Sequence, residues 1–325
     1  MADYKGIQGY SVQKLSSDPT ASEATGQLWY NSTGGKFKVG TAGAGTWATG
    51  NNINTARRYI SGVGSSTAGL LISGNAPGVN YCESFDGTCW TEVADLSANI
   101  MTRGRAGTQT AALAGGGVNG GAQANCESWN GSAWTEVNNV NVSKYAFAGS
   151  MGVQTAALIA GGTPPATPAD AETWDGTCWT EGNNINNARN SGGGCGTTTA
   201  SLIFGGTPPT PSLGVHTESY NGTSWTETNN LNVGRYGIGG SGLQTAAIAI
   251  AGGTPTWVDS TELWDGTSWT EAGNLGTAVR WAGNSTITAT NSAFNAGGLV
   301  ATPASTATTE IWTNPVYAIK TVTVS

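Results

Sequence analysis

The sequence predicts an all-β protein built as a six-bladed β-propeller, and three observations lead to that fold class. Trp-Thr-Glu triplets recur along the chain, and Glu-x-aromatic patterns recur with the same period. The composition, with 50 glycines, 13 tryptophans and only 10% charged residues, is far from that of a helical protein. Repeats of about 44 residues without a helical apolar rhythm are typical of propeller blades, each of which holds four strands.

Two aromatic series define the repeat. Successive Trp-Thr-Glu tryptophans are separated by 44, 45, 46 and 44 residues, and Trp47 stands 43 residues before the first of them. Both series have six members, and the repeat therefore predicts six blades. The first series is Trp47, Trp90, Trp134, Trp179, Trp225 and Trp269, and the second is Phe85, Trp129, Trp174, Tyr220, Trp264 and Trp312.

Each repeat divides into four short strand candidates. In the fifth repeat they cover approximately residues 235–242, 243–253, 260–264 and 268–271. Asp265-Gly266 between the last two is a tight hairpin turn signal. The paired aromatics of the outer strands are expected to fill the space between blades, and the Gly-rich first strand suits the crowded axis.

The two ends of the chain predict how the propeller closes. The last repeat reaches Trp312 and then meets Asn314-Pro315 where a Trp strand is expected, while the strand of Trp47 has no repeat before it. We expect the Trp47 strand to complete the blade that ends at Trp312, as a non-covalent clasp. The domain prediction is an N-terminal arm over 1–40, the propeller over 41–313 and a C-terminal strand over 314–325, which we expect to pair with residues 36–39.

A Gly-Gly doublet ends the second strand of several repeats, at 161–162, 205–206 and 252–253, and an aromatic and then a Trp follow it. This pattern resembles the kelch family over roughly residues 41–313. The resemblance implies a kelch-like propeller. In this chain the aromatic and the Trp are only five residues apart, which departs from the family, and the fold alone does not define a function.

The residues of this chain do not match the patterns of two kinds of enzymatic propeller. A copper oxidase of the galactose-oxidase kind needs His and Tyr ligands and a Tyr–Cys crosslink, and this chain has one histidine, His216, which we expect in a solvent-exposed loop. Residues 84–90 and 173–179 resemble the Asp-box turn of sialidases, although Asp and Gly are adjacent here. We therefore expect no catalytic residue, no metal and no cofactor. The five cysteines are expected to be unpaired small residues.

Net charge and hydropathy exclude two classes of partner. The net charge of -7 does not suit binding to a phosphate backbone, so no nucleic acid is expected. No apolar run approaches the roughly 18 residues that span a bilayer, and the N-terminus has no secretory signal pattern. Neither membrane insertion nor signal-directed secretion is expected.

One basic residue opens the predicted first strand of each repeat. The set can be interpreted as an anion-binding ring at one mouth of the central channel, or as six side chains that fasten each blade through a carboxylate or a carbonyl. We favour the fastening role. The six residues are Arg57, Arg103, Lys144, Arg189, Arg235 and Arg280.

Variable loops on one face are the candidate recognition surface, because binding residues concentrate in loops on rigid scaffolds. Trp257 is the leading candidate: it could stack on a sugar or a protein partner, or pack on its own blade. Asn-rich connections such as 51–54 and 183–186 could bind glycans, but their recurrence favours a role in turns. The candidate binding residues are Thr163, Pro164, Thr207, Pro208, Thr254, Trp257 and His216.

The N-terminal arm carries a further resemblance. Leu28-Trp29-Tyr30-Asn31 and the Gly-Lys-Phe-Lys-Val run at 35–39 look like short elements near the start of tail-fibre and other virion structural proteins of tailed bacteriophages. The resemblance implies a non-enzymatic virion protein, such as a tail appendage that mediates particle assembly and host attachment. Its partners would be other virion proteins through the arm, a host-surface glycan or protein, and further copies of itself. The alternatives are a free carbohydrate-binding lectin and a propeller glycoside hydrolase, located outside the cell or in the cytoplasm.

Overall fold

The computed structural model describes residues 12–20, 24, 26–75, 80–163, 169–207, 214–286, 292–302, 304–315 and 317–322. The described residues form β-strands, which make seven four-stranded sheets, and they include no helix able to cross a membrane. The chain divides into two compact units: unit 1 is Met1–Gly45 with Asn314–Ser325, and unit 2 is Thr46–Thr313. The boundary near the N-terminus thus falls at Gly45 rather than at residue 40.

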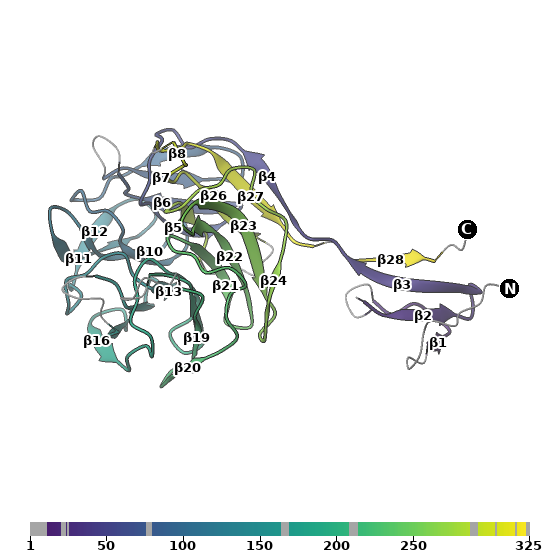
Figure 1. Ribbon diagram of the computed structural model, residues 1–325. Coiled ribbons are helices and arrows are strands. Elements are labelled where there is room, and N and C mark those ends of the chain that lie inside the picture. Colours follow the sequence, from purple (N-terminus) through teal and green to yellow (C-terminus); the bar gives the residue numbers. More distant parts are fainter. Residues whose placement is uncertain are drawn as a thin grey trace. The chain divides into compact units, whose positions relative to one another are not determined.

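Unit 2 contains six of the seven sheets, numbered here in chain order (Figure 1). The first sheet is β5 (Ser61–Ser65), β6 (Ala68–Ile72), β7 (Cys82–Phe85) and β8 (Trp90–Val93). The second is β9 (Gly104–Gly107), β10 (Ala112–Val118), β11 (Ala122–Trp129) and β12 (Trp134–Val137). The third is β13 (Gly149–Val153), β14 (Ala156–Ala160), β15 (Ala171–Trp174) and β16 (Trp179–Gly182).

The remaining three sheets follow the same plan. The fourth is β17 (Gly193–Gly196), β18 (Ser201–Phe204), β19 (Thr217–Tyr220) and β20 (Trp225–Glu227). The fifth is β21 (Gly239–Leu243), β22 (Ala246–Gly253), β23 (Trp257–Trp264) and β24 (Trp269–Glu271). The sixth is β25 (Gly283–Asn284), β26 (Phe294–Ala296), β27 (Thr309–Thr313) and β4 (Thr46–Gly50). In all six, neighbouring strands are antiparallel, as expected for a β-propeller.

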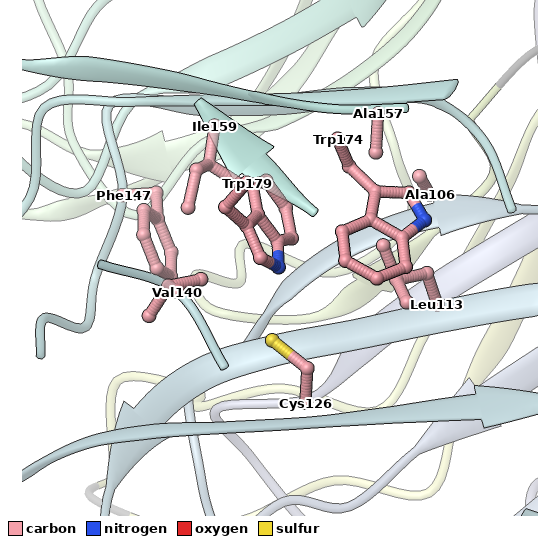
Figure 2. Close-up of a cluster of buried hydrophobic side chains, with 9 residues drawn as sticks. All are labelled: Ala106, Leu113, Cys126, Val140, Phe147, Ala157, Ile159, Trp174 and Trp179. Carbon is pink, nitrogen blue, oxygen red and sulfur yellow. The ribbon is translucent and has the colours of Figure 1, made fainter. Parts of the chain in front are cut away.

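The core of unit 2 lies between successive sheets. Each sheet buries its faces by packing against the sheets before and after it. Figure 2 shows the cluster between the second and third sheets, where Leu113 and Cys126 meet Ile159 and the two tryptophans Trp174 and Trp179. Five comparable clusters occur among the described residues, and one of them joins Leu71 and Phe85 of the first sheet to Phe294 of the sixth.

The two aromatic series meet as predicted, because each hairpin turn places the third and fourth strands in register. Trp174 is paired with Trp179 across one such hairpin, and their ring centroids are 5.5 Å apart. The Asp175 carboxylate accepts hydrogen bonds from the backbone N–H groups of Thr177 and Cys178, which holds the Asp-Gly turn. These two bonds lower the pKa of Asp175.

The sixth sheet is assembled from both ends of unit 2. Strand β4 pairs antiparallel with β27, and Trp47 lies directly opposite Trp312 with 5.3 Å between ring centroids. The Trp47 indole N–H also donates to Thr261 Oγ1 of the fifth sheet at 2.9 Å. The expected pairing of the Trp47 strand with the Trp312 strand is therefore present.

Unit 1 is a single sheet with strand order β1-β2-β3-β28. Its strands are β1 (Gln13–Leu15), β2 (Leu28–Asn31), β3 (Lys36–Ala42) and β28 (Tyr317–Thr321). Strands β2 and β3 form an antiparallel hairpin, in which Leu28 lies opposite Val39. The C-terminal strand pairs with β3, and Lys320 lies opposite Val39. Unit 1 thus contains both ends of the described chain.

Candidate functional site

Five basic residues that precede a first strand are buried and paired with the glutamate of the third strand in the same sheet. The nitrogen–oxygen distances are 2.9 Å for Arg103–Glu127, 2.6 Å for Arg189–Glu218 and 2.8 Å for Arg235–Glu262. Arg57 pairs with Glu83, and Lys144 pairs with Glu172 at 3.3 Å. The fastening interpretation fits these five residues. An anion-binding ring is wrong for them, because their charges are already satisfied by carboxylates.

The prediction that Arg280 belongs to this set of paired basic residues is wrong. Its backbone bridge to Leu299 aligns it with Arg58 and Tyr145, each of which follows a paired basic residue. The equivalent of Arg57 in the sixth sheet is therefore Val279, which is buried in an apolar cluster. The Arg280 guanidinium lies over three aromatic rings instead, 4.0 Å from the Trp281 centroid, 4.4 Å from Trp257 and 5.1 Å from Tyr236.

The sixth sheet therefore keeps its glutamate without a basic partner. Glu310 forms no ion pair among the described residues, although its Oε2 accepts the Gly276 N–H at 2.7 Å. Burial raises the pKa of this carboxyl. The same hydrogen bond to a connecting segment recurs at the other five glutamates, for example from Asn186 N–H to Glu218 at 2.7 Å. This shared contact explains why the position is always Glu.

The Asn-rich connections bind the neighbouring outer strand. Asn54 Nδ2 donates to the Trp90 carbonyl at 3.1 Å, and Asn232 Nδ2 donates to the Trp269 carbonyl at 3.0 Å. Asn141 and Asn186 make the equivalent bonds. Their recurrence is thus explained by joining one sheet to the next.

The candidate loop residues do not form one site. Thr163 and Thr207 form backbone bridges with Tyr145 and Asn190. His216 is half-buried, and its carbonyl accepts the Gly205 N–H at 3.1 Å. The Thr254 N–H donates to the Thr256 carbonyl at 2.8 Å. Pro164 and Pro208 lie outside the described residues.

Trp257 is the first residue of β23 rather than part of a loop, because it pairs with Gly253 across the extended β22–β23 ladder. Its ring is half-buried beneath Arg280, and its indole Nε1 is buried without a described partner. The contact favours the interpretation in which Trp257 packs on its own and the adjoining sheet.

The strongest candidate site is a cavity of about 450 Å³ lined by residues of at least five of the six sheets. A volume in this range suits a small organic ligand. Six residues that precede the first strands surround it with left-handed backbone (φ from 50° to 61°), a conformation uncommon for non-glycine residues. These residues, called the left-handed ring below, are Tyr59, Thr102, Ala146, Ser191, Gly237 and Trp281.

Backbone hydrogen bonds connect members of the left-handed ring. Gly237 N–H donates to the Ser191 carbonyl at 2.7 Å, and Trp281 N–H donates to the Gly237 carbonyl at 2.9 Å. Tyr59 N–H donates to the Trp281 carbonyl at 2.9 Å, which links the first sheet to the sixth. The positive φ turns each amide toward its neighbour, so the strained conformation is offset by these bonds.

Aromatic side chains supply the apolar part of the lining. The Tyr59 and Trp281 centroids are 4.5 Å apart, and Trp281 is 6.1 Å from Tyr236 in an edge contact. Tyr145 and Phe147 line the cavity as well. Trp281 can lie flat here because its neighbour is Gly237: a Cβ at that position would be 2.7 Å from the indole Nε1.

Arg105 is a lining residue that sequence reasoning missed. It occupies β9, and the ladder Arg105↔Ala114↔Glu127 shows that it shares a register with the glutamate. Arg103, two positions earlier, fits the recurring basic position of this repeat, and it hides Arg105 in the sequence pattern. An alignment of the repeats on this glutamate identifies Arg105 as exceptional, because the equivalent residues in the other sheets are uncharged. They are Gly62, Ser150, Gly194, Gly240 and Asn284.

The described lining contains no Asp or Glu. Among the described residues, no three His, Cys, Asp or Glu side chains gather as a metal site would require. Cys82, Cys126 and Cys195 are buried and free, and burial raises the pKa of Cys82 and Cys195 to about 12. These three thiols are therefore poor nucleophiles.

Comparisons with known proteins support the fold. No protein-family model matches the chain, and no curated protein matches it. A solved structure described as "Structure of YjhT", a propeller protein, matches with a TM-score of 0.63 and 11% sequence identity. The match covers 84% of this chain and 99% of that one. At this identity the likeness shows the β-propeller fold alone.

Proposed function

We propose that this chain is a structural protein of a tailed-bacteriophage virion, a tail fibre or other tail appendage component. Unit 1 attaches it to the particle, and unit 2 contacts the host surface. The observation that carries the proposal is the composition of unit 1, in which β3 of the N-terminal segment pairs with β28 of the C-terminal segment. The propeller is thus held through both ends of its chain. An attachment module of that kind suits a particle component.

The side chains of unit 1 are compatible with docking. Leu28 and Phe37 are 37% and 38% exposed, although both are large and apolar. Trp29 is buried, and its indole N–H donates to Asp18 at 3.0 Å, which fixes the N-terminal segment against the sheet. Exposed apolar side chains on a sheet surface are compatible with the binding of another protein, which would cover them.

We also propose that the six sheets of unit 2 are the six blades of one kelch-like ring, closed by β4. Three features support this arrangement: the apolar clusters between successive sheets, the contact of the sixth cluster with the first sheet, and the hydrogen bond from Tyr59 to Trp281. A closed ring has no long exposed sheet edge that could template aggregation.

The test is the composition of purified particles. Particles released from cells that produce this chain are purified by density gradient, and their proteins are quantified by mass spectrometry. We expect the chain at a constant, stoichiometric ratio to the major capsid protein. Recovery of the chain only in the soluble fraction would overturn the proposal. A chain restricted to residues 46–313 is the matched control, and we expect it to be absent from particles while remaining folded.

A free lectin is the second candidate, and the aromatic lining of the cavity is the observation in its favour, since sugars stack on Tyr and Trp rings. Such a protein would bind monosaccharides as an isolated propeller and would not co-purify with particles. Glycoside hydrolysis ordinarily needs two carboxyl groups beside the scissile bond. The described lining of the cavity offers none.

A further inference from the structure

Arg105 breaks the symmetry of unit 2 at the cavity. Among the six residues that share its register, four line the cavity, and Arg105 alone of those six carries a charge. The others are small or neutral, such as Ser150 and Asn284. Residues with a structural role recur at equivalent positions in successive sheets, whereas this cation does not. A single charged residue in an otherwise neutral register indicates a ligand rather than a packing role.

The Arg105 guanidinium has no partner in the described part of the chain. No ion pair or hydrogen bond to it is formed there, and its Nε is buried. Arg103, which also lines the cavity, is paired with Glu127 and donates to two carbonyl oxygens. Desolvation lowers the pKa of Arg105 to about 10, so it remains a cation at neutral pH. Among the described lining residues, Arg105 is therefore the cation without a compensating carboxylate, in a protein of net charge -7.

Neutral groups that can complete an anion site lie in the same lining. The Ser150 hydroxyl makes no hydrogen bond to a described residue. Asn284 Nδ2 is already bonded to Asn295, which holds that side chain in place. Tyr59 and Trp281 add apolar ring surface. The lining thus combines the guanidinium group of Arg105, the hydroxyl of Ser150 and the ring surfaces of Tyr59 and Trp281.

We propose that the cavity binds a small organic carboxylate, with Arg105 donating two parallel hydrogen bonds to the carboxylate and Trp281 and Tyr59 packing on the body of the ligand. Arginine suits this task because its planar fork matches the two carboxylate oxygens. A carboxylate carries a single negative charge and balances the Arg105 cation. A phosphate monoester, with about -1.5 to -2 charges at pH 7, would leave an excess negative charge in the cavity. The inference is independent of any attachment to a virion.

The test uses the full chain and three probes of similar shape: benzoate, phenyl phosphate and neutral benzyl alcohol. Isothermal titration calorimetry at low salt is expected to show that benzoate binds more tightly than either of the others. In wild-type protein, benzoate is also expected to shift the Arg105 Nε–H signal in a nitrogen-15 NMR spectrum. Equal binding of benzoate and benzyl alcohol would overturn the proposal, and so would tighter binding of phenyl phosphate.

Two variants connect the binding to Arg105. R105Q is expected to weaken benzoate binding by roughly 10- to 100-fold, the loss of charge-assisted hydrogen bonds, and to leave benzyl alcohol unaffected. K320Q removes the same charge from unit 1 and is expected to bind benzoate as wild type does. R105Q that retains full benzoate affinity would contradict the proposal. If R105Q does not fold, the NMR shift of wild-type Arg105 decides: a signal that does not move at saturating benzoate refutes it.

Discussion

Five sheets of the propeller hold a buried ion pair, and the sixth holds the same glutamate without the cation. In the fourth sheet, Arg189 and Glu218 are both fully buried and 2.6 Å apart. In the sixth sheet, Val279 takes the place of the basic residue, and Glu310 relies on backbone N–H groups. The glutamate is therefore kept for its hydrogen bond to the connecting segment, which all six share. The cation neutralises that buried carboxylate where it is present.

The sixth sheet also differs in how it is built. Its fourth strand comes from the N-terminal side of the propeller, whereas each other sheet uses four consecutive strands. Strand β4 can therefore detach from the sixth sheet while the other five sheets keep all of their strands. The sheet that lacks the ion pair is thus also the one that depends on joining the two ends of unit 2.

Loss of the joining strand should have the largest effect. A chain that begins at residue 51 lacks β4, so Trp47 no longer covers Trp312 or bonds to Thr261. Removal of one large aromatic from a core costs about 3–5 kcal/mol, and the exposed β27 edge adds to this. We expect loss of cooperative unfolding, measured by circular dichroism during heating. A chain that begins at residue 46 keeps β4 and should unfold cooperatively; identical behaviour of the two chains would show that the joining strand is dispensable.

Neutralising a paired glutamate should have the next largest effect. E218Q leaves Arg189 buried without its carboxylate, and breaking a buried pair by removing one partner costs about 3–5 kcal/mol. Urea denaturation at pH 7 measures the loss in free energy of unfolding. The surface variant E227Q, made in the adjoining strand, should change stability by less than about 1 kcal/mol. A fourth sheet that tolerates E218Q would mean that the pair contributes little.

The equivalent substitution in the sixth sheet, E310Q, should have the smallest effect on the free energy of unfolding. Unlike E218Q, it should not lower that free energy. The pKa of Glu310 is raised in the folded state, so the folded chain binds more protons than the unfolded chain between the two pKa values. Stability from this group therefore falls as pH rises above the ordinary carboxyl pKa. E310Q should remove that fall and be at least as stable as wild type at pH 7, with a smaller difference at pH 4. Urea denaturation at both pH values tests this, and a large loss at pH 7 would contradict it.

The periodic features of the fold could be predicted from sequence, because each is caused by a residue type that recurs. The aromatic pairs, the Asp-Gly turns and the Trp47–Trp312 pairing follow from the repeat. The equivalence of the six basic residues could be predicted less well from the sequence. Arg280 stands one position after the place of Arg57, and only the backbone bridges and the positive φ of Trp281 reveal the shift.

The candidate site was not predicted, for a related reason. In a sequence, recurring residues indicate structure and variable loops indicate function, a pattern that favours Trp257 and the Pro-containing loops. Arg105 lies within a strand and two residues from a recurring arginine. Its proposed role depends on the lack of a partner among the described residues, a three-dimensional property that no spacing reveals. The left-handed backbone of Tyr59 and Trp281 is likewise set by hydrogen bonds between distant segments.

The joining pair of strands has a mechanical consequence. Thr46 and Thr313 are opposite one another in the β4–β27 ladder, and the chain passes from each of them directly into unit 1. A pulling force applied through unit 1 thus reaches both strands at the same end of the ladder and draws them in the same direction. Tension is shared by two covalent connections, and it is resisted by the Trp47 and Trp312 side chains, which pack against the fifth sheet. A single-ended tether would instead load one strand and peel it from its partner.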